Sequence, residues 1–130
     1  MDVKHRELVE ELRIARRVLV VDDHPSFRRC ARALLVAEGF EVVGEAEDGA
    51  AALALAAELE PDLVLLDVQL PDIDGFAVAA RLRDRDPRVA VVLVSSRDPS
   101  AYGFRVEASG ARGFVSKEEL SGAALEKLLE

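Results

Sequence analysis

The sequence has a single cysteine, Cys30, and no run of hydrophobic residues long enough to cross a membrane. One cysteine excludes an internal disulfide. Cys30 is expected to be a small buried side chain, because it falls on the same predicted helical stripe as Phe27, Ala31 and Leu34. The longest apolar runs have the length of β-strands, so the sequence excludes a membrane-spanning protein.

Basic residues and targeting signals are also scarce. The 17 lysines and arginines are outnumbered by 25 aspartates and glutamates, which gives a net charge of −8. Such a charge repels phosphate backbones, so direct nucleic-acid binding through this domain is not expected. Residues 1–7 are mostly charged and lack the apolar core of a secretory signal, which favours a cytoplasmic location.

The sequence does contain alternating strand and helix patterns, in a composition that is 50% hydrophobic and 32% charged. This composition and the length of 130 residues indicate one soluble globular domain. We expect strands near residues 17–22, 40–46, 62–67, 89–95 and 112–116. Helices are expected near residues 25–38, 49–60, 73–84, 99–109 and 118–129. Five strands interleaved with helices predict an α/β fold with a parallel sheet covered on both faces.

An extra helix is predicted before the first strand. Leu8, Val9 and Leu12 have helical spacing within residues 4–16, with charged residues between them. We therefore divide the chain into an N-terminal helical extension, 1–16, and a domain, 17–130, with no effector domain expected after it. The extension is interpreted as a dimerisation element, a docking surface or a passive segment, which leaves a homodimer open.

Carboxylates follow two of the hydrophobic strands directly. Residues 18–21 lead into Asp22 and Asp23, and residues 63–66 lead into Asp67. If the sheet has the strand order 2-1-3-4-5, strands one and three are neighbours and the three acids meet at its carboxyl edge. Carboxylates in such proximity repel one another, and a bound divalent cation relieves that repulsion. The sequence thus predicts a metal site.

Ser95 and Lys117 follow strands four and five and are expected at the same edge. Phosphoryl transfer requires neutralisation of the phosphoryl oxygens, which a metal, a lysine and a hydroxyl can supply. Asp67 can also attack phosphorus, because carboxylates form acyl phosphates. His24 is expected to be an exposed loop residue rather than a metal ligand, since no second histidine or cysteine has ligand spacing.

Four motifs occur in order and resemble the receiver domains of two-component response regulators. They are Val20 to Pro25, Leu66 to Gly75, Ser95, and Gly110 to Lys117. The resemblance covers residues 17–129 and is greatest to the subgroup whose receivers usually precede a helix-turn-helix effector. It implies a flavodoxin-like, doubly wound sheet of five parallel strands in the order 2-1-3-4-5.

The resemblance implies roles for individual residues. Asp67 matches the phosphoacceptor, Asp23 the acid that binds Mg²⁺ directly, and Asp22 its neighbour that acts largely through water. The backbone carbonyl of Gln69 matches the position that completes the metal shell. Ser95 matches the switch hydroxyl that turns toward the phosphoryl group.

Further matches concern the surroundings of the phosphoacceptor. Lys117 matches the lysine that pairs with the phosphoryl group, and Phe114 the aromatic rotamer switch. Pro71 and Gly75 match the loop that shapes the pocket. The sequence departs from the usual pattern at Phe114, where many receivers have tyrosine, and at Asp72, where glycine is commoner.

The resulting prediction is a phosphorylated switch. A sensor histidine kinase or phosphotransfer protein would donate a phosphoryl group to Asp67 in the presence of Mg²⁺, and the surface of residues 99–129 would change for an unidentified protein partner. The domain would catalyse its own phosphorylation and dephosphorylation without being a turnover enzyme. The alternative is a receiver fold that binds proteins without phosphorylation. An aspartyl phosphatase is disfavoured by Gln69, and a nucleotide-binding flavodoxin-like protein by the lack of a glycine-rich phosphate loop.

Overall fold

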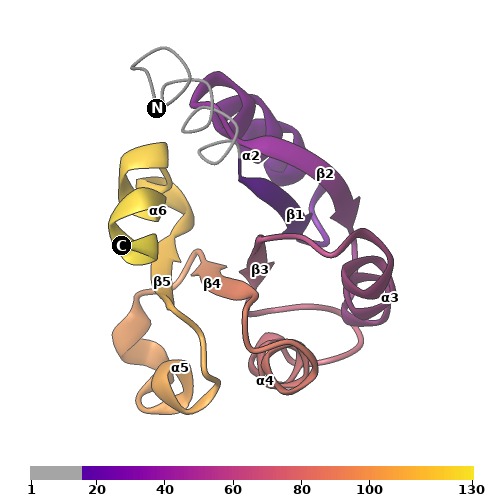
Figure 1. Ribbon diagram of the computed structural model, residues 1–130. Helices are drawn as coiled ribbons and strands as arrows, with labels where there is room; N and C mark the ends of the chain where they lie inside the picture. Colours follow the sequence, from indigo (N-terminus) through magenta and orange to yellow (C-terminus); the bar gives the residue numbers. More distant parts are fainter. Residues whose placement is uncertain (1–15) are drawn as a thin grey trace, which may run out of the picture.

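The computed structural model describes residues 16–130, which form one parallel sheet with helices on both faces (Figure 1). The predicted N-terminal helix at residues 4–16 lies almost wholly outside the described residues. The strands lie in the order β2-β1-β3-β4-β5. Their bounds are β1 Arg17–Val21, β2 Glu41–Ala46, β3 Leu63–Asp67, β4 Ala90–Ser95 and β5 Gly113–Ser116. The predicted α/β class, the five strands and their order are confirmed.

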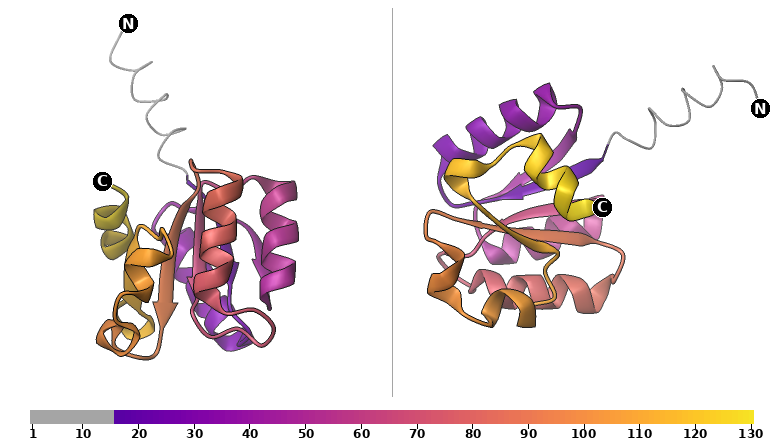
Figure 2. Two further views of the ribbon diagram at one scale, coloured as in Figure 1. Left: turned by 90° about the horizontal axis from the view of Figure 1, so that it is seen from below. Right: turned by 90° about the vertical axis from the view of Figure 1, so that its left-hand side faces the viewer.

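The helices cover the two faces of the sheet in the pattern of a doubly wound fold. One face packs against α2 (Pro25–Ala37) and α6 (Gly122–Leu129), whose buried residues include Leu35 and Leu125. The other packs against α3 (Gly49–Leu59) and α4 (Gly75–Arg85), with α5 (Arg105–Ala108) beside them. Figure 2 shows the two groups of helices on opposite sides of the strands. Within residues 16–130, no helix combines the length and the apolar character needed to span a bilayer.

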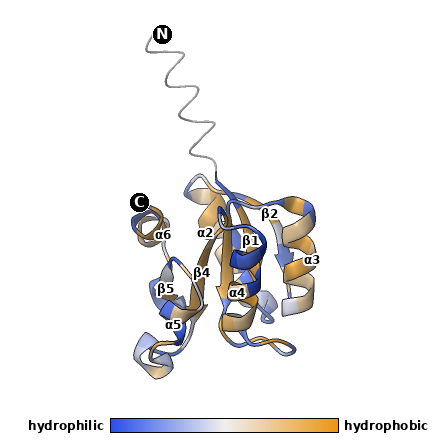
Figure 3. Ribbon diagram, turned by 60° about the horizontal axis from the view of Figure 1, so that its bottom comes forward, coloured by the Kyte–Doolittle hydropathy of each residue, from blue (hydrophilic) through white to orange (hydrophobic). Residues whose placement is uncertain are grey.

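Buried hydrophobic residues explain why β1, β3 and β4 occupy the middle of the sheet. All five residues of β3 and all six of β4 are buried, whereas β2 at one edge is mostly half-buried. Figure 3 shows β4 in the hydrophobic colour along its length. Strands buried on both faces need continuous apolar runs, as these sequences have.

Three predicted helices begin or break at other residues than expected. The predicted helix at 73–84 begins at Gly75, because the Asp74 carboxylate accepts a hydrogen bond from the Phe76 N–H at 2.7 Å and caps it. The segment 99–109 is divided into the 3₁₀ helix η1 (Pro99–Tyr102) and α5, since Gly103 lies between them with φ +57°. At the C-terminus, η2 (Lys117–Glu119) precedes α6, which Ser121 caps.

The expectation that Cys30 is buried is wrong. Cys30 is exposed, whereas Ala31 and Leu35 on the same helix are buried and Phe27 is half-buried. Ala31 and Leu35 are four residues apart and face the sheet together, while Cys30 lies about 100° around the helix from Ala31. Cys30 therefore lies outside the stripe that packs on the core.

Candidate functional site

The site is built where β1 and β3 end side by side. Val21 of β1 pairs with Leu66 of β3, so the next residues, Asp22 and Asp67, lie together at the carboxyl edge of the sheet. The side chains are almost fully buried, with Asp22 0% and Asp67 3% exposed. Two carboxylates in this setting repel each other unless a cation lies between them. The predicted meeting of these acids is confirmed.

Lys117 supplies that positive charge. Its Nζ lies 2.6 Å from Asp22 Oδ2 and 3.2 Å from Asp67 Oδ2, and 4.6 Å from the centre of the Phe27 ring. The sheet explains this position, because Ser116 pairs with Ser95 on β4 and Lys117 is the next residue. Burial lowers the pKa of Lys117, but the two carboxylates outweigh this effect and leave the pKa raised. Lys117 is thus held as a cation between the acids.

The environment of Asp67 opposes its ionisation. Burial is the largest influence and raises the pKa of Asp67 to about 6, with a further increase from the charge of Asp22. The backbone N–H of Gln69, which donates to Asp67 Oδ1 at 3.1 Å, lowers the pKa, as does Lys117. Each Asp67 oxygen therefore has one donor, Gln69 for Oδ1 and Lys117 for Oδ2, and the carboxylate plane is fixed.

Asp23 and His24 lie at the exposed rim of the site. His24 is exposed as predicted, but its Nδ1 lies 3.0 Å from both Asp22 Oδ1 and Asp23 Oδ1. One ligand atom from each of Asp22, Asp23, His24 and Asp67 can be chosen so that all four lie within 4.8 Å of one another. The carboxylates thus present a group of oxygens that opens toward solvent at Asp23.

This set of donors fits a hard divalent cation. Carboxylate oxygens are the ligands that Mg²⁺ prefers, and the cluster carries three of them. Asp22 Oδ2 is buried and has no well-aligned hydrogen bond among the described residues, although Lys117 Nζ is close to it. An acceptor of this kind can still be bound by a cation. The ligand role expected of the Gln69 carbonyl stays a prediction.

Ser95 lies at the end of β4, beside the strand that carries Asp67, and is 1% exposed. Its Oγ accepts a hydrogen bond from the Arg97 N–H at 3.1 Å and lies 2.6 Å from the hydroxyl oxygen of Tyr102. Phe114, on β5, is half-buried with its ring centre 5.9 Å from that of Tyr102. The structure thus gives Ser95 and Phe114 a common neighbour.

The loop between β3 and α4 lies close beneath Asp67 because Gly75 has no side chain. The Gly75 N–H donates to the Val68 carbonyl at 2.9 Å. A Cβ at position 75 would lie 2.4 Å from the Asp67 carbonyl oxygen and 2.7 Å from the Val68 Cα. Gly75 therefore permits a backbone contact that sets the position of Asp67.

Asp72 has a role that the sequence did not reveal. Its carboxylate accepts hydrogen bonds from the N–H groups of Gly49, at 2.7 Å, and Ala50, at 2.9 Å, at the start of α3. These bonds, that of Gly49 first, lower the pKa of Asp72. The departure from glycine at this position thus joins the loop after β3 to a helix that begins 23 residues earlier.

Replacing Asp72 with alanine is expected to lower the melting temperature by a few degrees at pH 7, because α3 loses a capping carboxylate. The folded pKa of Asp72 is depressed, so its contribution is present above the unfolded pKa and is lost as pH falls through the folded pKa. Thermal unfolding followed by circular dichroism should show the difference at pH 7 and little at about pH 3. The melting temperature of Asp72→Asn should fall between those of the wild type and Asp72→Ala. A difference in melting temperature that does not change with pH would contradict the capping role.

Sequence reasoning also missed Tyr102 and Arg28. The Arg28 guanidinium donates to the Asp22 carbonyl at 2.6 Å and pairs with Glu45, its Nε 3.3 Å from Oε1. Only the packing of α2 beside β2 reveals these contacts of Arg28. A tyrosine seven residues after Ser95 gave no signal, because the contact depends on the turn that η1 makes.

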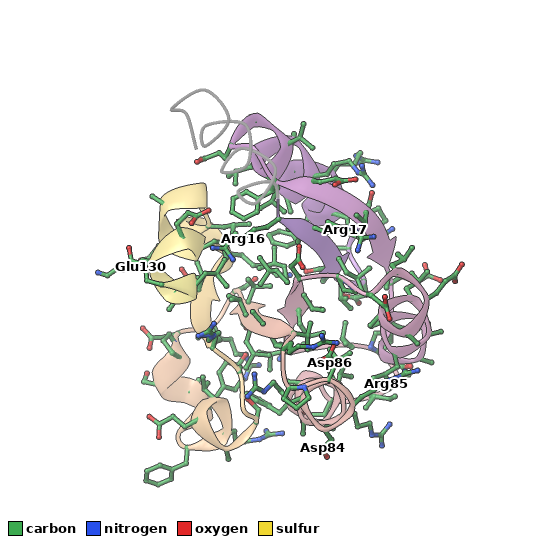
Figure 4. The ribbon with its side chains drawn as sticks, in the orientation of Figure 1. Arg16, Arg17, Asp84, Arg85, Asp86 and Glu130 are labelled. Atoms are coloured by element: carbon green, nitrogen blue, oxygen red, sulfur yellow. The ribbon has the colours of Figure 1, made fainter. Side chains whose placement is uncertain are left out.

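Two hollows open on the described part of the chain, one beside the site and one away from it. A groove of about 510 Å³ adjoins the site between the loop after β3 and the segment η1–α5, and Tyr102 and Arg105 contribute to its wall. A cleft of about 480 Å³ lies between the C-terminal ends of α3 and α4 and is lined in part by Arg85 and Asp86 (Figure 4). Asp22, Asp23 and Asp67 line neither hollow.

Known proteins share this sequence and fold. The profile of the response regulator receiver domain matches residues 18–129. A putative transcriptional regulator of Pseudomonas aeruginosa is 44% identical over 103 residues, which are 79% of this chain and 50% of that protein. The probable transcriptional regulatory protein NarL of Mycobacterium tuberculosis is 41% identical over 115 residues, 88% of this chain and 53% of that protein. The chain thus spans about half the length of these curated relatives.

Solved structures agree. The receiver domain of the putative response regulator NarL from Mycobacterium tuberculosis superimposes with a TM-score of 0.77 and 41% identity, covering 88% of this chain and 96% of that one. A LuxR-family two-component response regulator from Aurantimonas sp. SI85-9A1 gives a TM-score of 0.80 and 31% identity, covering 88% of this chain and 86% of that one. The four motifs, the strand order and these similarities lead to one conclusion: the chain belongs to the receiver domain family of two-component response regulators.

Proposed function

We propose that Asp67 is the phosphoacceptor of this receiver domain. The observation that carries the proposal is the buried Asp67 carboxylate, held by Gln69 and Lys117 at the sheet edge that also presents Asp22 and Ser95. An Asp67 oxygen would attack the phosphorus of a phosphohistidine. The new O–P bond would form as the P–N bond breaks, and the bonding electron pair would leave with the imidazole nitrogen. Lys117 would then pair with the phosphoryl oxygens.

A magnesium ion would be held by Asp22, Asp23 and Asp67 and by the backbone carbonyl of Gln69. When bound, it would neutralise charge on the phosphoryl oxygens during the transfer. The chain's own residues orient the acceptor and exclude water: Gln69 and Lys117 fix the carboxylate, and burial protects the acyl phosphate. Asp22 and Lys117 balance each other's charge in the buried part of the site.

Receiver domains of response regulators partner with histidine kinases, and we infer that such a kinase or a phosphotransfer protein is the donor here. The output would be a change in the surface of residues 99–129, read by a protein partner. Names of the curated relatives, which are transcriptional regulators, support gene regulation as the class of output. A cytoplasmic location and the separation of residues 1–16 from the domain 17–130 stay predictions.

The direct test is phosphorylation of the whole chain by acetyl phosphate with Mg²⁺, followed by intact mass spectrometry. The wild type is expected to gain one phosphoryl group and Asp67→Asn none, because the amide is not a nucleophile of this kind. Asp84→Asn is the matched control, since Asp84 is an exposed acid on the outer face of α4 (Figure 4) and should leave the mass gain unchanged.

An unmodified wild type under saturating acetyl phosphate and Mg²⁺ would contradict the proposal. It would favour the alternative function, a receiver fold that binds proteins without phosphorylation. Magnesium titration separates the two functions further, because the phosphoacceptor requires Mg²⁺ to bind near Asp67 and the interaction module does not.

A further inference from the structure

The hydroxyl of Tyr102 is the closest polar neighbour that the structure gives Ser95. The two hydroxyl oxygens are 2.6 Å apart, and the Arg97 N–H donates to the same Ser95 oxygen at 3.1 Å. Serine has one hydrogen and two acceptor positions, and Arg97 occupies one of these positions. The bond to Tyr102 uses the serine hydrogen or its remaining acceptor position, and together with the Arg97 bond it holds Ser95 Oγ on the Tyr102 side.

The Tyr102 ring is packed between two other aromatic rings. Its centre lies 5.4 Å from that of Phe76 in an edge-on arrangement and 5.9 Å from that of Phe114. Such aromatic contacts hold the ring in place and leave its hydroxyl group available for hydrogen bonding. Tyr102 thus contacts Ser95, the start of α4 and the predicted aromatic switch.

A second contact joins the same segment to α4. The Arg105 guanidinium of α5 lies 4.4 Å from the centre of the Phe76 ring and forms an ion pair with Asp74, the residue that caps α4. The segment of η1 and α5 is therefore attached to the start of α4 through Tyr102 and Arg105. Of these two attachments, only that of Tyr102 ends on a residue expected to contact the phosphoryl group.

We propose that Tyr102 is a positioning residue that holds the Ser95 hydroxyl in its resting orientation and transmits the departure of this hydroxyl to η1 and α5. The proposal rests on the proposed function, in which Ser95 turns toward a phosphoryl group on Asp67. When the Ser95 side chain turns toward that group, its Oγ moves away from Tyr102, and the Tyr102 hydroxyl loses its partner in a half-buried position. An unpaired polar group of this kind is costly, so Tyr102 and the segment that carries it rearrange.

The composition of the chain makes this contact directly observable. Tyr102 is the single tyrosine and there is no tryptophan. Near-ultraviolet absorption at wavelengths longer than the phenylalanine band therefore reports on Tyr102 alone. Ser95→Ala removes the hydroxyl partner and is expected to shift the tyrosine band of the resting protein. Beryllofluoride with Mg²⁺ should shift the band of the wild type in the same direction and leave that of Asp67→Asn unchanged.

The second arm measures beryllofluoride affinity by calorimetry. Tyr102→Phe keeps the ring between Phe76 and Phe114 but removes the hydroxyl that holds Ser95, so binding with Mg²⁺ should become roughly 2- to 10-fold tighter, the factor expected for loss of one hydrogen bond. Phe104→Ala is the matched control, because Phe104 is in the same segment but is 86% exposed. This control should bind beryllofluoride like the wild type.

The outcomes separate this inference from the proposed function. A tyrosine band that is the same in the wild type and Ser95→Ala would overturn the inference without any phosphoryl donor being used. Unchanged affinity in Tyr102→Phe would also overturn it. Failure of acetyl phosphate to modify the wild type would instead contradict the proposed function, while a band shifted by Ser95→Ala would still support the resting contact.

Discussion

Replacing Gly75 with alanine is expected to destabilise the domain by about 3 kcal/mol or more. The added Cβ would lie 2.4 Å from the Asp67 carbonyl oxygen and 2.7 and 2.8 Å from two backbone atoms of Val68. These atoms belong to the main chain of the central strand and the residue after it, so no side-chain rotation can relieve the overlap. Urea denaturation at pH 7 would measure the loss of unfolding free energy.

The same substitution should also displace Asp67, the proposed phosphoacceptor. Any shift that accommodates the new methyl group moves the backbone of Asp67, and acetyl phosphate should then modify the variant more slowly than the wild type. Gly103→Ala is the control: Gly103 has φ +57° and ψ −130° but no atom within 4 Å of an added Cβ, so its loss of about 1–3 kcal/mol would come from backbone strain alone. If Gly75→Ala lost less unfolding free energy than Gly103→Ala, the predicted overlap of the added Cβ with the backbone of Asp67 and Val68 would be wrong.

Asp67→Asn is expected to stabilise the domain at neutral pH even as it removes the proposed phosphoacceptor. The folded pKa of Asp67, about 6, is raised above its ordinary value of 3.8, so the folded state binds this proton more tightly than the unfolded state. Stability from this group is therefore present below the unfolded pKa and is lost as pH rises through about 6. The asparagine amide does not ionise and therefore avoids that loss. A gain of about 1–2 kcal/mol in unfolding free energy at pH 7 is expected after allowance for screening by solvent.

This prediction has a characteristic pH profile. In buffer with a chelator, the unfolding free energies of Asp67→Asn and the wild type should be similar near pH 4 and diverge up to about pH 7. Asp72→Asn provides a comparison of opposite sign, because the pKa of Asp72 is lowered and its contribution is lost in acid. If the unfolding free energies of Asp67→Asn and the wild type differed by the same amount near pH 4 and at about pH 7, burial would not oppose ionisation of Asp67.

Much of the site could be predicted because its residues follow strands directly. Asp22, Asp67, Ser95 and Lys117 each come at or just after the end of an apolar run, and the ends of parallel strands share one edge. The ends of the helices were harder to predict from the sequence. Gly103 was visible in the sequence, but the helical spacing around it favoured one helix over the two short ones that form.

Contacts between distant segments account for what the sequence did not reveal. Asp72 caps a helix that begins 23 residues earlier. The contact of Tyr102 with Ser95 spans only seven residues, but it depends on the turn of η1 between them. Cys30 has helical spacing from buried neighbours and yet is exposed, since the angle at which α2 packs decides which side of the stripe is covered. None of these depends on local propensity.

The order of the residues is enough to predict the five strands, the burial of the middle ones and the carboxylates at their ends, because apolar periodicity and strand termination are properties of neighbouring residues. The pairing of the charges, in contrast, depends on the folded arrangement of the chain. Lys117 lies closer to Asp22 than to Asp67, Asp67 is buried enough to raise its pKa, and Tyr102 lies against Ser95. Such distances are set by how elements far apart in the chain pack together, and that packing is a property of the whole fold.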